Sequence, residues 1–142
     1  MTQKTVLLVD DEQGLLEPLR DALEFEGFRV ITASTGSDAL QILEKRHVDL
    51  VTVDVMLPPG KDMPDTPSHR VGVELCRIIT RDWPQTAVMA LSVVNDRATI
   101  AEIERYGVRF LRKGETPLRT VVNMLRSRLT GVAFDTHDPR RR

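Results

Sequence analysis

The chain has 142 residues, of which 41% are hydrophobic and 29% charged, a composition typical of a single globular domain. Its 20 Lys and Arg residues nearly balance 21 Asp and Glu residues, so the net charge gives no indication of a nucleic-acid-binding surface. No apolar stretch reaches the ~20 residues of a membrane helix, and a single cysteine excludes an intramolecular disulfide. We therefore expect a cytoplasmic protein that contacts neither membranes nor, directly, nucleic acid.

Short apolar runs alternate with longer segments of helical periodicity along the chain. In chain order, the apolar runs are 6–9, 30–31, 50–53, 87–91 and 108–112. The helical segments that follow them are 15–23, 39–43, 73–79, 100–103 and 118–129. The first four runs are continuous rather than alternating, which is typical of parallel strands covered on both faces. The last run alternates in part, which indicates a strand at the edge of the sheet.

This fivefold alternation predicts an α/β fold, a flavodoxin-like, doubly wound sheet of five parallel strands with five helices. Crossover connections between parallel strands are right-handed, and the strand order 2-1-3-4-5 is common for a chain of this length. We place this domain at residues 1–130. Residues 131–142 lack sustained apolar periodicity and are interpreted as a C-terminal tail.

Acidic residues follow the first and third predicted strands. Asp10, Asp11 and Glu12 follow the first strand, and Asp54 follows the third. In the order 2-1-3-4-5 these strands are neighbours, and ligands bind outside the carboxyl ends of such strands. Carboxylates held this close raise one another's pKa unless a cation neutralises them, and a site made only of oxygen ligands suits Mg²⁺. The sequence therefore predicts a magnesium site beside Asp54.

The fourth and fifth strands contribute a hydroxyl group and an ammonium group at the same edge. Ser92 ends the fourth strand and Lys113 follows the fifth. Carboxylates, a metal ion, a hydroxyl and an ammonium together suit phosphoryl transfer, where catalysis is mainly positioning and charge neutralisation. Each residue alone also has a simpler interpretation: Asp10 and Asp11 as a turn or helix cap, Ser92 as a capping hydroxyl, and Lys113 as a solvated side chain.

Four segments carry these residues in a fixed order, each at the end of a predicted strand: Val9–Glu12, Asp54–Pro58, Ala90–Ser92 and Lys113. Together they resemble the receiver domain of bacterial two-component response regulators, over residues 4–130. The resemblance implies that a sensor histidine kinase or a phosphotransfer protein donates a phosphoryl group to the chain. It also implies that the chain is not an enzyme with a separate substrate, but a phosphoacceptor that catalyses its own phosphorylation and dephosphorylation.

The resemblance assigns a role to each residue that handles phosphate. Asp54 would be the phosphoacceptor, and Ser92 and Lys113 would hold phosphoryl oxygens. Phe110, three residues before Lys113, stands at the aromatic switch position of the family and would act as a switch together with Ser92. Plain core packing is the alternative interpretation of Phe110.

The resemblance also implies a set of metal ligands. Asp11 would bind Mg²⁺ directly, and Asp10 more remotely, often through water. Asp54 and the backbone carbonyl of Met56 would be the other ligands from the protein.

Two features depart from the family pattern. The glycine that matches the family motif is Gly72, eighteen residues after Asp54, which implies an insertion within residues 59–71. Residues 58–70 hold four of the eight prolines, so we expect no regular helix or strand there. The insertion could shield the site, contact a partner or follow no ordered path.

Gly114 replaces the proline that follows a cis peptide in the family, and we expect a trans bond because a non-proline cis bond costs about 2.5–4 kcal/mol.

We therefore expect a receiver domain that relays its signal by protein–protein contact or onward phosphotransfer. Only residues 131–142 follow the fifth predicted helix, too few for a helix-turn-helix domain, and the downstream partner is not evident. The alternative is a degenerate receiver that binds a partner without phosphate. A Mg²⁺-dependent phosphatase of the haloacid dehalogenase type is a further alternative, but it would need a carboxylate where Met56 stands.

Overall fold

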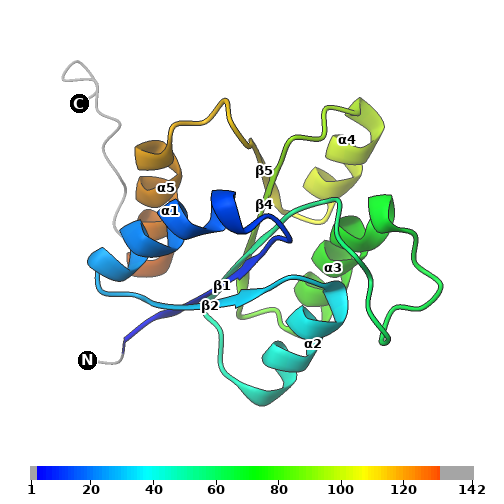
Figure 1. The fold of residues 1–142 in the computed structure, drawn as a ribbon, viewed down its shortest axis with the longest axis horizontal. Helices are drawn as coiled ribbons and strands as arrows, with labels where there is room; N and C mark the ends of the chain where they lie inside the picture. The colour runs from blue at the N-terminus through cyan, green and yellow to red at the C-terminus, as the bar shows by residue number, and fades with distance from the viewer. Residues whose placement is uncertain (1–2, 132–142) are drawn as a thin grey trace.

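The computed structural model describes residues 3–131 and shows one parallel sheet covered by helices on both faces (Figure 1). The strands lie in the order β2-β1-β3-β4-β5, with the bounds β1 (Thr5–Val9), β2 (Arg29–Ala33), β3 (Leu50–Val53), β4 (Ala87–Ser92) and β5 (Arg109–Arg112). The helices are α1 (Gln13–Phe25), α2 (Gly36–Lys45), α3 (Ser68–Asp82), α4 (Arg97–Arg105) and α5 (Leu118–Thr130). The predicted flavodoxin-like fold, its strand order and the edge position of the last strand are confirmed.

Two apolar layers hold the helices on the sheet. Alternate residues of a strand point to opposite faces, so neighbouring residues of β1 enter different layers. Val6 and Leu8 belong to the cluster formed with α1 and α5, whereas Leu7 and Val9 belong to the cluster formed with α2, α3 and α4. All four side chains are essentially inaccessible to water, which explains the continuous apolar runs in the sequence.

The register of the sheet brings the first acidic residues to one edge. Val9 of β1 lies opposite Val53 of β3, and both residues end their strands. The backbone N–H of Asp54 donates to the carbonyl of Val9 at 3.0 Å, and the N–H of Asp10 donates to Ala33 of β2 at 3.0 Å. Both aspartates are thus fixed by the sheet's own hydrogen bonding at adjacent carboxyl ends.

Helix α3 begins earlier than the prolines predict. The expectation that residues 58–70 contain no regular helix or strand is wrong for the last three residues, because α3 begins at Ser68. Pro67 stands immediately before the first turn, where a missing N–H and a fixed φ are compatible with a helix. The last proline of the segment therefore starts the helix rather than interrupting it.

Close packing also positions α3 against the end of β3. A Cβ atom on Gly72 would lie 2.2 Å from the carbonyl oxygen of Asp54 and 2.4 Å from the Cα atom of Val55. The N–H of Gly72 donates to the carbonyl of Val55 at 2.9 Å. Only a residue without a side chain allows this approach, so Gly72 couples α3 to the backbone of Asp54.

The predicted insertion at residues 59–71 is attached to the start of α2. The carbonyl of Pro59 accepts the backbone N–H of Ser37 at 2.9 Å and its hydroxyl at 3.1 Å. The same hydroxyl oxygen accepts the N–H of Asp62 at 2.7 Å, and the side chain of Met63 is buried. These contacts favour an ordered segment held on the α2 side of the molecule.

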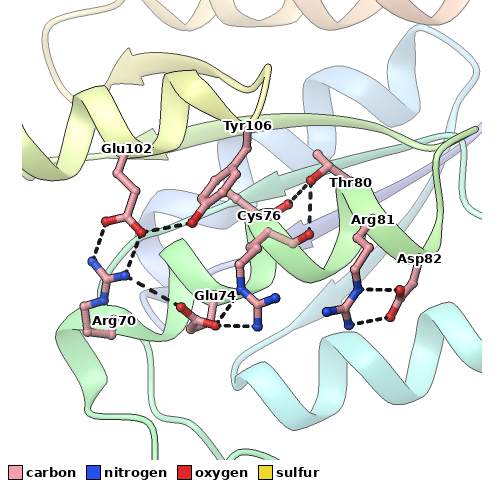
Figure 2. Close-up of polar contacts among 9 residues, drawn as sticks. Arg70, Glu74, Cys76, Thr80, Arg81, Asp82, Glu102 and Tyr106 are labelled. Carbon is pink, nitrogen blue, oxygen red and sulfur yellow. Dashed lines mark hydrogen bonds and ion pairs between the residues drawn. The ribbon is translucent and has the colours of Figure 1, made fainter.

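Ion pairs and hydrogen bonds join α3 to α4 across the surface (Figure 2). Arg70 of α3 donates two hydrogen bonds to Glu102 of α4, and Tyr106 donates a third to the same carboxylate. Glu74 lies 3.6 Å from the Arg70 guanidinium and also pairs with Arg77. The network ties α4 to the first turns of α3.

Of the predicted tail at 131–142, only Gly131 belongs to the described residues. Within residues 3–131, no helix combines the length and the apolar character that crossing a membrane would require.

Candidate functional site

Three carboxylates gather at the carboxyl edge of β1 and β3. As whole residues, Asp10 and Asp54 are each only 6% exposed, and Glu12 lies on the surface beside them. One carboxylate oxygen from each of the three lies within 4.8 Å of the other two. The backbone N–H of Glu12 also donates to Asp10 Oδ1 at 2.9 Å, which fixes the turn that leads into α1. Hard oxygen donors at this spacing are chemically suited to a cation such as Mg²⁺.

Lys113, which follows the outermost strand β5, supplies a cation to the same carboxyl end of the sheet. Its Nζ lies 2.5 Å from Asp10 Oδ2 and 2.9 Å from Asp54 Oδ2, and all three side chains are 8% exposed. The three residues are distant in sequence and meet because strands β1, β3 and β5 end at the same edge. The ammonium group therefore bridges the two buried aspartates predicted from the sequence.

Burial and pairing shift the pKa values of this group. Burial raises the pKa of Asp10 above its usual value, against the lowering effect of the hydrogen bond from Lys113. Burial also opposes the charged form of Lys113, but its hydrogen bonds and charge interactions with Asp10 and Asp54 outweigh burial and raise its pKa. Lys113 is consequently a permanently charged partner at neutral pH.

The turn after β5 sets the path of Lys113. The backbone N–H of Lys113 donates to the carbonyl of Ser92 at 2.9 Å, which extends the pairing of β4 with β5. Gly114 has a φ of +86°, a conformation that glycine adopts without the steric cost of a side chain. The described residues contain no cis peptide bond, so the expected trans bond before Gly114 is confirmed.

The predicted switch residues Ser92 and Phe110 lie on the neighbouring strands β4 and β5. Ser92 is fully buried, and its Oγ accepts the backbone N–H of Val94 at 3.3 Å. Among residues 3–131, no hydrogen bond joins Ser92 Oγ to Asp54 or Lys113. Phe110 is partly buried and packs against the apolar layer formed with α2, α3 and α4.

The remaining predicted metal ligands lie on the surface. Asp11 is exposed and is not part of the group of three carboxylates, whereas its neighbour Glu12 is. Met56 is 51% exposed, two residues after Asp54. Sequence reasoning included Glu12 in the acidic run but gave it no ligand role. Glu12 lies two residues beyond Asp10, and its backbone N–H donates to the Asp10 carboxylate. This local turn directs Glu12 back toward the site.

A cavity of about 200 Å³ opens beside Asp10, Asp54 and Lys113. Apolar side chains from the two helices on that face line it, namely Leu16, Leu19, Leu118 and Val121. No residue of the insertion at 59–71 belongs to its lining. The insertion therefore does not cover the cavity next to the carboxylates.

Transcriptional regulatory proteins are among the relatives that match part of the chain. AfsQ1, a transcriptional regulatory protein of Streptomyces coelicolor, is 36% identical over 92 residues, which are 65% of this chain and 36% of that protein. PhoP, the alkaline phosphatase synthesis transcriptional regulatory protein of Bacillus subtilis, is 47% identical over 93 residues, or 66% of this chain and 35% of that protein. The matched segment thus spans little more than a third of either relative.

Solved structures and a family model agree with the fold. The signal receiver domain of an HD domain-containing protein from Pseudomonas fluorescens Pf-5 has a TM-score of 0.76 and 27% identity, covering 90% of this chain and 95% of that one. A CheY-like receiver domain from Methanospirillum hungatei JF-1 has a TM-score of 0.77 at 22% identity, with 90% and 94% covered, a likeness of fold. The family described as the response regulator receiver domain matches residues 6–123. With the expected carboxylates and lysine at one edge of the expected sheet, the chain belongs to the response regulator receiver domain family of two-component systems.

Proposed function

We propose that the chain accepts a phosphoryl group on Asp54 from a sensor histidine kinase or a phosphotransfer protein, with the help of Mg²⁺. The observation that carries the proposal is the bridge of Lys113 between Asp54 and Asp10. A buried carboxylate that pairs with an ammonium group is positioned to act as a nucleophile. The same ammonium can neutralise a phosphoryl oxygen once the group has been transferred.

The transfer is a single displacement at phosphorus. A carboxylate oxygen of Asp54 forms a bond to phosphorus while the bond from phosphorus to the donor nitrogen or oxygen breaks. The electron pair of the broken bond stays on the donor, which takes up a proton when it is a histidine. The product is an acyl phosphate on Asp54, and Lys113 lies within hydrogen-bonding distance of that side chain.

The donor set suits Mg²⁺. We assign its protein ligands to Asp10, Asp11, Asp54 and the backbone carbonyl of Met56, with Glu12 as a further carboxylate at this edge. Bound there, Mg²⁺ would supply positive charge to the crowded carboxylates and to the phosphoryl oxygens. Asp10 contributes by holding Lys113, and Glu12 contributes through its backbone N–H, which orients Asp10.

Phosphorylation would be sensed through Ser92 and Phe110. Ser92 Oγ is buried and bonded to Val94, so holding a phosphoryl oxygen requires this hydroxyl to change partner. Such a change moves the loop between β4 and α4, to which Val94 belongs. Phe110 on the neighbouring strand β5 packs in the same apolar layer as Val94, the layer formed with α2, α3 and α4. Ser92 and Phe110 are therefore the proposed switch residues.

The output we propose is regulatory contact in the cytoplasm rather than turnover of a substrate. AfsQ1 and PhoP are both named as transcriptional regulatory proteins, and both are longer than this chain. We assign the receiver unit to residues 1–130, with the insertion at 59–71 as a partner-contact segment on the α2 side. The downstream partner would distinguish the phosphorylated from the unphosphorylated form of this unit.

The test is labelling by acetyl phosphate in the presence of Mg²⁺, read by intact-protein mass spectrometry. The unmodified sequence should gain one phosphoryl group, and Asp54→Asn should gain none because an amide is a poor nucleophile. Asp21→Asn, which alters an exposed carboxylate of α1, is the control and should label normally. Equal labelling of Asp54→Asn, or labelling that persists when a chelator removes Mg²⁺, would contradict the proposal.

A further inference from the structure

The cavity beside Asp54 offers more room than phosphoryl transfer uses. Its volume is about 200 Å³, and it extends between α1, α5 and the sheet, where Asp10, Asp54 and Lys113 line it together. An apolar cavity of roughly 150 Å³ is large enough to bind benzene. This cavity therefore accommodates one six-membered ring with a short substituent.

Apolar side chains line the cavity on both helices. Leu16 and Leu19 come from α1, Val121 comes from α5, and Leu91 comes from β4 beneath them. Gly114 also lines the cavity and contributes no side chain, and apart from its chain neighbours no atom lies within 4 Å of its Cβ position. Apolar surroundings hold water poorly, so the cavity favours the apolar body of a ligand.

The charged groups of the lining are negative on balance. Asp10 and Asp54 contribute two carboxylates against the single ammonium of Lys113, which pairs with both. Within residues 3–131 no hydrogen bond reaches Oδ1 of Asp54. Since every fully buried side-chain oxygen in that range has a partner, this atom keeps access to solvent or to the cavity. A positively charged group with N–H donors is complementary to it.

We propose that the cavity binds a small primary amine that carries one apolar ring. The ammonium group donates to Asp54, and the ring lies among the apolar side chains of α1 and α5. A carboxylic acid of the same size would place its negative charge beside Asp10 and Asp54, which repel it. An amine in the cavity also covers Asp54 and would block its phosphorylation. That consequence rests on the proposed function, whereas binding itself requires no phosphoryl donor.

The test is titration of the purified, unphosphorylated chain with benzylamine, followed by the backbone amide signals in two-dimensional NMR spectra. The shifts should saturate with a millimolar dissociation constant, as expected for so small a ligand, and should be largest around the cavity, at Gly114 and Thr116. Methylamine lacks the ring and benzoate carries the opposite charge. Each should bind at least ~10-fold more weakly than benzylamine.

Substitutions that fill the cavity locate the binding site. Val121→Phe should raise the dissociation constant of benzylamine at least ~10-fold. Val122→Phe is the matched control, because Val122 is also a buried valine of α5 but lines a different hollow, and it should leave the constant unchanged. Leu118→Trp fills the same cavity from a position that is 44% exposed, so it provides the test if Val121→Phe does not fold.

Asp54→Asn separates the charge of the site from its shape. It should weaken benzylamine binding and reduce the preference for benzylamine over benzoate. Unchanged affinity in Val121→Phe or Leu118→Trp, equal affinity for benzoate, or shifts that do not saturate would overturn the proposal. Saturable binding at the cavity in a chain that acetyl phosphate does not label would contradict the proposed function alone, and labelling of Asp54 without benzylamine binding would contradict this inference alone.

Discussion

Arg70 and Glu102 form a bidentate ion pair that joins the first turn of α3 to α4, with both N–H···O distances at 2.8 Å. The side chains are 32% and 22% exposed, so water screens the pair only in part. Tyr106, at the end of α4, donates its hydroxyl to the same carboxylate at 3.0 Å. The position of α4 therefore depends on Arg70, which lies in the first turn of α3 and near the end of the insertion at 59–71.

A double-mutant cycle on Arg70 and Glu102 should measure this link. Arg70→Gln, Glu102→Gln and the double variant should give a coupling of about 0.5–1 kcal/mol in the free energy of unfolding, the upper range for pairs near a surface. The control cycle uses Arg81 and Asp82, which are also bidentate but are adjacent in sequence and more exposed (Figure 2). Equal coupling in the two cycles, measured by urea unfolding, would show that the α3–α4 link adds nothing to the stability of the folded chain.

Acid should weaken the same link within a defined range of pH. The hydrogen bond from Arg70 lowers the pKa of Glu102 from 4.5 to about 2 in the folded chain. Because the folded state favours the charged form, this stabilisation is complete above the unfolded pKa and is lost as the pH falls through the folded pKa. Unfolding free energies of the unmodified chain and Glu102→Gln should therefore differ most at neutral pH and converge toward pH 2. A constant difference across that range would contradict the assignment.

Gly72 should tolerate no side chain, because its Cβ would overlap the backbone of Asp54 and Val55. We expect Gly72→Ala to destabilise the fold by about 1–3 kcal/mol, the cost of overpacking, and to slow phosphorylation of Asp54. Gly14→Ala is the matched control, since Gly14 is also helical and, apart from its chain neighbours and its own helix backbone, has no atom within 4 Å of its Cβ position. That change should leave stability unchanged or raise it by up to about 1 kcal/mol. Equal unfolding free energies for the two variants would contradict the close approach of α3.

The sequence was sufficient for the parts of the site that the sheet itself builds. Asp10, Asp54 and Lys113 each follow a strand, and parallel strands in the order 2-1-3-4-5 bring those ends together whatever the loops do. The strands were predictable because their residues are buried on both faces and leave continuous apolar runs.

The sequence was insufficient to predict side-chain positions that depend on the conformation of a single turn. Whether Asp11 or Glu12 turns toward Asp54 depends on the three residues that connect β1 to α1, and no apolar periodicity reports on so short a segment. The attachment of the insertion to Ser37 and the pairing of Arg70 with Glu102 join residues more than twenty positions apart. Such side-chain contacts leave no periodic pattern in one sequence, so only the structure reveals them.

The acyl phosphate on Asp54 should be long-lived, with a half-life of minutes rather than seconds. Hydrolysis needs an oriented water, and Met56 and Val94 offer at most a weak hydrogen-bond acceptor for one. Met56 is half exposed, so its replacement should disturb the core little, whereas Val94 is partly buried and packs against the apolar layer formed with α2, α3 and α4. Met56→Asn with Val94→Glu should accelerate loss of phosphate ~10²-fold, whereas Met56→Asn with Val93→Glu should not. The measurement is decay of the phosphorylated chain in excess Mg²⁺, and equal decay of all forms would contradict this explanation.

Chemical mapping of the phosphorylated residue tests the central claim most directly. Borohydride reduces an acyl phosphate of aspartate to the alcohol, which converts the modified residue into homoserine and leaves free carboxylates unchanged. After phosphorylation with acetyl phosphate and Mg²⁺, reduction and peptide mass spectrometry should find homoserine at position 54 alone, next to the ammonium of Lys113. Homoserine at Asp10, Asp11 or Glu12, or none at position 54 in a chain that has taken up phosphate, would contradict the account.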